Sequence, residues 1–194
     1  PEQPSRRRWL ALGLAAALLP LLVLKYSGML VPGLRDLYKP FGLAYYSLQL
    51  AGYLLDVWHG RTAPTPSYAR LWCYAGFFLS LTQGPFNRYN TLMPQLEAAP
   101  KTFETQRLVS GLQRSAWGYF KKFAIADRAA IVVSAAFADP ASFDRSQLIF
   151  ATVMYSFQLY ADFSGYTDIV LGMGEILGLH LPENRHGTHV FHLA

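Results

Sequence analysis

Five apolar blocks separated by polar connectors dominate this sequence. Their bounds are Trp9–Leu24, Phe41–Leu55, Leu71–Asn87, Ser146–Ala161 and Ile169–Leu181. Only the last block contains Asp, Glu, Lys, Arg or His residues, namely Glu175 and His180. Each is slightly shorter than the roughly 20 residues that a helix needs to cross a bilayer core, but lysine and arginine at the block ends can extend it. The pattern predicts an all-α, polytopic membrane helical bundle.

The composition supports this prediction over a soluble protein with buried core helices. Hydrophobic residues make up 52% of the chain and charged residues 15%, whereas soluble domains carry about 25% charged residues. Polar surface is therefore too scarce to solvate so large a core. The net charge is +5, but the basic residues mark the ends of apolar blocks, which favours lipid headgroups over nucleic acid. A single cysteine, Cys73, excludes an internal disulfide.

Residues 114–137 show a different pattern. Their first part, Trp117–Phe123, mixes aromatic side chains with Lys121 and Lys122, and the later part, Ala129–Ala138, has no charge. Aromatic and lysine side chains of this kind are typical of helices that lie at the headgroup level. We predict an interfacial or re-entrant helix here, and the orientation of the chain across the membrane stays open.

The most unusual segment is Gln158–Asp168 (QLYADFSGYTD), which brings polar residues directly after an apolar block. An ionised aspartate costs about 2.5–3.5 kcal/mol at the centre of a membrane helix, so Asp162 and Asp168 need a compensating role. On a helix, Asp162 would share a face with Tyr166, and Ser164 with Asp168. Two interpretations stay open: a polar site inside a helical bundle, or a helix–loop–helix corner with an aspartate as N-cap.

Two further features allow a structural and a functional interpretation. Gly174 and Gly178, with Gly172, have the small-residue spacing that is typical of close helix packing. Arg88 follows a turn at the end of an apolar block. It either reaches the headgroups or binds an anion beside the free backbone donors of the loop.

Several short motifs follow one another in a characteristic order. They are Tyr53–Gly60, Gly84–Pro85 with Arg88, Gly118–Asp127, and Leu159–Ile169 with Leu181–Asn184. In this order they resemble the membrane-bound O-acyltransferase (MBOAT) family, and within it the bacterial branch of alginate O-acetylation and teichoic acid D-alanyl transfer. The resemblance implies a partial, incomplete MBOAT membrane domain over residues 1–184, with re-entrant or interfacial helices.

The resemblance further implies an enzyme. It would transfer an acyl group, expected to be acetyl, from a thioester such as acetyl-CoA to hydroxyls of a cell-surface polysaccharide, without a bound cofactor. A histidine general base would deprotonate the attacking hydroxyl. The implied location is the bacterial inner (plasma) membrane, crossed several times. The implied partners are the lipid bilayer and an extracytoplasmic acyl-accepting protein or polysaccharide. The alternative is a non-catalytic transport or structural subunit whose intramembrane aspartates serve ion or proton passage.

The resemblance also suggests site residues, none of which is expected to be the catalyst. Arg88, Lys121 and Lys122 would meet an anionic donor. Five others would line a tunnel or support the site: Asp162, Ser164, Tyr166, Asp168 and Asn184.

The tail at 185–194 departs from the family pattern. The family continues after the motif that ends at Asn184 towards a segment with the catalytic histidine, whereas Arg185 follows here. His186, His189 and His192 recur every third residue, but only Glu183 lies near them, so no metal site is predicted. We expect residues 1–194 alone to lack the catalytic histidine and to transfer no acyl group.

Overall fold

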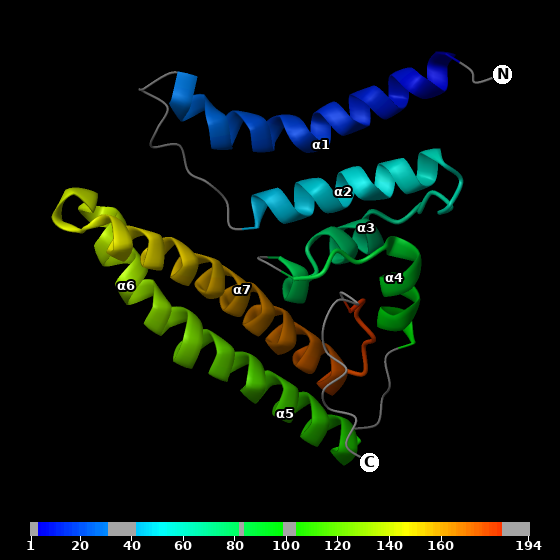
Figure 1. Ribbon diagram of the computed structural model, residues 1–194. Coiled ribbons are helices and arrows are strands. Elements are labelled where there is room, and N and C mark those ends of the chain that lie inside the picture. Colours follow the sequence, from blue (N-terminus) through cyan, green and yellow to red (C-terminus); the bar gives the residue numbers. More distant parts are fainter. Residues whose placement is uncertain (1–3, 31–41, 82–83, 99–103, 184–194) are drawn as a thin grey trace. The chain divides into compact units, whose positions relative to one another are not determined.

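A computed structural model describes residues 4–30, 42–81, 84–98 and 104–183 (Figure 1). Every regular element in these ranges is helical, which confirms the predicted all-α class for this part of the chain. The α-helices are α1 (Pro4–Leu30), α2 (Leu43–Trp58), α3 (Tyr68–Ala75), α4 (Tyr89–Glu97), α5 (Thr105–Phe120), α6 (Asp127–Ala138) and α7 (Arg145–Ile176). The chain forms two compact units, one containing α1 to α4 and the other α5 to α7.

Helix α1 is well suited to cross a membrane. Its stretch Arg6–Tyr26 has a mean hydropathy of 1.9, and no part of it is buried. Among the described residues it is the one helix that has both the length and the hydropathy of a span. Arg6 Nη2 donates a 2.9 Å hydrogen bond to the carbonyl of Trp58 at the end of α2, and its guanidinium lies 4.9 Å from the centre of the Trp58 ring. The membrane character of the bundle is therefore supported by one helix.

The apolar block Leu71–Asn87 does not form one helix, which corrects the expectation of a membrane-spanning segment there. α3 ends at Ala75 with Gly76 as its C-cap, a short 3₁₀ turn follows at Phe78–Ser80, and residues 84–88 are not helical. Glycine is a poor helix former, and Pro85 has no N–H to donate. Hydropathy alone does not register these backbone constraints.

Three tyrosines form the aromatic core of the first unit. The Tyr89 ring lies 5.0 Å from that of Tyr53 and 5.3 Å from that of Tyr74, between ring centres. The Tyr74 hydroxyl donates a 2.8 Å hydrogen bond to the Asn87 carbonyl. Burial, with the nearby Asp56 carboxylate, raises the pKa of Tyr74 to about 12, so this hydroxyl remains a donor.

The second unit is a long antiparallel hairpin. α5, the π-helical segment η3 (Lys121–Ala126) and α6 form a continuous helical run, and α7 returns beside it (Figure 1). A 3₁₀ turn, Pro140–Ser142, connects the two arms. The helix predicted at residues 114–137 is thus confirmed as a helix, while its place at the membrane interface stays a prediction.

A single helix, α7, contains the whole apolar block Ser146–Ala161 and continues into the block Ile169–Leu181 as far as Ile176. Asp162 and Asp168 therefore lie in its interior, and the interpretation of this segment as a corner with an N-cap aspartate is wrong. The helix begins instead at Asp144, in a capping box with Gln147: each side chain accepts a hydrogen bond from the other residue's backbone N–H.

This N-cap gives a pH-dependent contribution to stability. The Gln147 backbone N–H, followed by the Ser146 hydroxyl, lowers the pKa of Asp144 below its ordinary value of 3.8. The cap therefore stabilises the helix at neutral pH, and this effect is lost only as the pH falls through the lowered pKa.

We expect Asp144→Ala to speed amide exchange in the first turn of α7 at neutral pH. Asp144→Asn, an uncharged cap, should keep slow exchange down to about pH 3. Equal exchange in the alanine variant and the parent would contradict this role.

Candidate functional site

The candidate site lies along the seam between α5 and α7. Buried positions recur there in steps of three and four: Gly111, Ser115 and Gly118 on α5, and Ala161, Gly165, Asp168 and Gly172 on α7. Such steps are typical of helices that cross at a small angle. A Cβ atom on Gly118 would lie 2.5 Å from the Gly165 carbonyl oxygen, and one on Gly111 would lie 2.5 Å from that of Gly172. The two backbones are thus in direct contact.

The predicted packing role of the glycines near the end of α7 is confirmed in part. Gly172 packs against α5, and Gly174 lies against Leu181, whose Cδ1 would be 2.8 Å from an added Cβ. Gly178 has another role, because it follows the helix with a φ of 73°, in the left-handed region that favours glycine.

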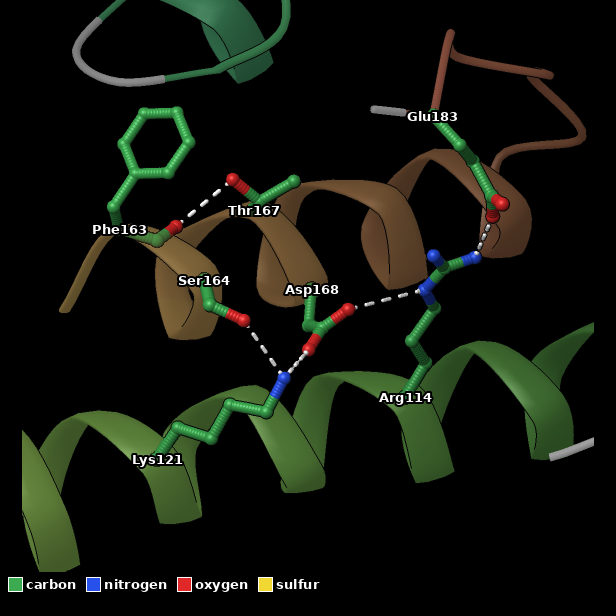
Figure 2. Close-up of polar contacts among 7 residues, drawn as sticks. All are labelled: Arg114, Lys121, Phe163, Ser164, Thr167, Asp168 and Glu183. Carbon is green, nitrogen blue, oxygen red and sulfur yellow. Dashed lines mark hydrogen bonds and ion pairs between the residues drawn. The ribbon is translucent and has the colours of Figure 1, made fainter. Parts of the chain in front are cut away.

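Lys121 contacts both Ser164 and Asp168, the two residues that were predicted from the sequence to share one face of a helix. Its Nζ lies 2.9 Å from Ser164 Oγ and 2.5 Å from Asp168 Oδ2 (Figure 2). The Asp168 side chain is 8% exposed and that of Lys121 13%. At such burial each charge depends on its partner, because an unpaired charge would pay the full cost of desolvation. The predicted shared face of Ser164 and Asp168 is confirmed.

Arg114 supplies a second cation to Asp168. Its Nε lies 3.6 Å from Asp168 Oδ1, and its Nη1 lies 2.6 Å from Glu183 Oε1 (Figure 2). Arg114 was not among the site residues predicted from the sequence. A signal was present in the sequence, however, because Arg114 precedes Lys121 by seven residues, which places both side chains on the same face of the continuous helical run of α5 and η3.

A second ion pair lies beside the first. Lys122 Nζ is 2.5 Å from Asp162 Oδ1, and both side chains are about one-third exposed. The π-helical segment begins at Lys121, so both lysines lie in its first turn. After them, the next buried positions are Ala126 and Ala129. A π turn accommodates one extra residue, and such turns occur frequently at functional sites. Here it accompanies two successive lysines that both reach α7.

The chain is similar over most of its length to bacterial polymer acetylases. It is 30% identical over 196 residues to the probable alginate O-acetylase AlgI of Azotobacter vinelandii, covering 93% of this chain and 38% of that protein. The corresponding protein of Pseudomonas aeruginosa is 29% identical, with 93% of this chain and 37% of that protein covered. The peptidoglycan O-acetyltransferase of Helicobacter pylori is 28% identical over 219 residues, covering 94% of this chain and 42% of that protein. The chain belongs to the MBOAT family.

Membership places the chain in a family of acyltransferase enzymes. The chain spans less than half the length of these MBOAT relatives. No family model matches it.

The residues expected to meet an anionic MBOAT donor all have carboxylate partners. Lys121 and Lys122 pair with aspartates of α7, as described above. Arg88 belongs to the first unit, where its Nη1 lies 3.0 Å from Asp56 Oδ1, and its side chain is 63% exposed. Of the three, Arg88 has the most accessible cationic group.

The other expected site residues are only partly placed. Tyr166 is half-buried on α7, four residues beyond Asp162. Asn184 lies outside the described residues, and so do the three histidines of the tail. Within residues 4–30, 42–81, 84–98 and 104–183, no three His, Cys, Asp or Glu side chains come together as a metal site would require.

Proposed function

We propose that this chain is part of an O-acyltransferase of the bacterial inner membrane. It would transfer an acetyl group from a thioester donor, acetyl-CoA, to hydroxyls of a cell-surface polysaccharide. The observation that carries this proposal is the similarity, over 93–94% of the chain, to proteins named as acetylases of alginate and of peptidoglycan. Both polymers present sugar hydroxyls, so the proposed acceptor is a glycan hydroxyl.

The exposed side chains of the second unit support a membrane location. On α7, Ile149 is 66% exposed, Phe157 60% and Tyr160 68%. Large apolar surfaces of this kind usually contact lipid or another protein. We propose that the hairpin, like α1, lies in the bilayer, so that the protein crosses the membrane more than once.

The ion pairs between α5–η3 and α7 form a charged cluster, whose members are Arg114, Lys121, Lys122, Asp162 and Asp168. In this proposal the charged cluster supports the reaction without performing it. A general base must present a proton-accepting atom to the attacking hydroxyl. Asp162 and Asp168 are instead held by lysines at 2.5 Å. The charged cluster would keep α5 and α7 rigid where they line the acyl-transfer path. The exposed Arg88 would contact the anionic donor.

Expression of the complete coding sequence that contains this chain tests the proposal. The host should produce alginate and lack its own alginate O-acetylase, and the acetyl esters on its alginate and on its peptidoglycan should be quantified by mass spectrometry. We expect esters on one of these polymers, dependent on expression, and membrane vesicles should incorporate label from radiolabelled acetyl-CoA into the same polymer. The absence of esters from both polymers, with the protein present in the membrane, would overturn the proposal.

A further inference from the structure

The segment after α7, residues 177–183, folds back against the end of that helix; we call it the strap. The Leu179 N–H donates a 2.8 Å hydrogen bond to the Gly174 carbonyl, and the positive φ of Gly178 makes this reversal possible. Leu179 and Leu181 are 4% and 8% exposed. The strap is therefore a packed part of the second unit.

Arg114 connects the strap to both helices of the seam. Its guanidinium reaches Glu183 of the strap with Nη1, at 2.6 Å, and Asp168 of α7 with Nε, at 3.6 Å (Figure 2). The planar guanidinium can serve two carboxylates at once with a fixed geometry, whereas a lysine has a single charged nitrogen. Lys121 holds the other oxygen of Asp168, so the carboxylate that orients Arg114 is itself restrained.

We propose that Arg114 is a positioning residue, which clamps Glu183 and thereby fixes the strap against the end of α7. The kinetic consequence rests on the proposed acyltransferase function, whereas the clamp itself does not. A displacement of about 1 Å, caused by a change far from the chemistry, can slow an enzyme by about 100-fold. Release of the strap should therefore lower kcat and leave the KM for acetyl-CoA unchanged.

Hydrogen exchange tests the clamp independently of activity. In the complete protein in detergent or membranes, Arg114→Gln and Glu183→Gln should each speed exchange of the Leu179 amide by about fivefold, because a charge-assisted hydrogen bond is lost. The double variant should add little to either single change, since both remove the same contact. Arg107→Gln is the matched control: Arg107 lies on the same helix and pairs with Glu104 at 2.9 Å, away from the strap. Unchanged Leu179 exchange in Arg114→Gln would overturn the clamp.

Kinetics separate a positioning role from a merely structural one. Arg114→Gln should lower kcat for acetyl transfer about tenfold per folded molecule, with Arg114→Lys intermediate, and with KM within about twofold of the parent. Faster exchange together with an unchanged kcat would overturn the positioning role. A parent protein that acetylates no polymer would refute the proposed function, and the exchange experiment would still decide the clamp.

Discussion

Replacing Asp168 by alanine is expected to lower the free energy of unfolding by about 3–5 kcal/mol, the range for breaking a buried ion pair by removal of one partner. The carboxylate is 8% exposed and lies 2.5 Å from Lys121 Nζ and 3.6 Å from Arg114 Nε. Its removal leaves two cations close together, one of them 13% exposed, without the negative charge that stabilised them. The melting temperature in detergent, followed by circular dichroism, should fall by about 10 °C.

Lys121→Met should cost less, although it removes the other half of the same pair. Asp168 would keep Arg114 as a cationic partner, so the loss should approach that of a hydrogen bond to a charged group, about 1.5–3 kcal/mol. Glu104→Ala is the control for an exposed pair, since Glu104 is 52% exposed and such pairs contribute about 0–1 kcal/mol. Equal losses for Asp168→Ala and Lys121→Met would show that Arg114 does not share the carboxylate.

The sequence was sufficient to predict one part of this cluster and not the other. The spacing of Ser164 and Asp168 depends only on the helical period, so their shared face could be predicted. Their pairing with Lys121, 43 and 47 residues away, depends on the register of two helices. That register is set by contacts between backbones, and the expectation that Lys121 meets a donor anion took no account of it.

The glycines contained a signal for this register. Gly111 and Gly118 are seven residues apart on α5, and so are Gly165 and Gly172 on α7. Equal spacings on α5 and α7, which lie in opposite arms of an antiparallel hairpin, allow glycine to meet glycine twice, as the structure shows. From the sequence, close packing was predicted only for Gly172, Gly174 and Gly178.

The hydropathy pattern gave two wrong predictions of where helical segments begin and end. It joined residues 71–87, which Gly76 and Pro85 divide, because it does not register backbone constraints. It also separated the two apolar blocks of α7 at Asp162 and Asp168, although the helix continues through both. The lysines on the facing helix compensate these charges, and a hydropathy average along one segment does not include a partner from another segment.

Introducing valine at Gly118 should disrupt the hairpin. An added Cβ would lie 2.5 Å from the Gly165 carbonyl oxygen and 2.8 Å from the Ile169 backbone nitrogen, so it meets backbone atoms that cannot rotate away. We expect a loss of about 3 kcal/mol or more, the upper end for overpacking, because α5 and α7 must separate. That separation would also stretch the contact between Lys121 and Asp168, so faster hydrogen exchange should extend along α7 beyond Gly165.

Gly52 provides the matched control, because it is an exposed glycine in the interior of α2 and an added Cβ would meet nothing within 4 Å. Gly52→Val makes the same change in helix propensity without a collision and should leave the melting temperature nearly unchanged. Gly52→Ala should stabilise the protein by about 0.5–1 kcal/mol. Gly118→Ala should still destabilise it, because the collision exceeds the gain of about 1 kcal/mol in helix propensity. If Gly118→Ala instead raised the melting temperature as Gly52→Ala does, the helices would be farther apart than the glycine contacts require, and the close register that joins Lys121 to Asp168 would have to be rejected.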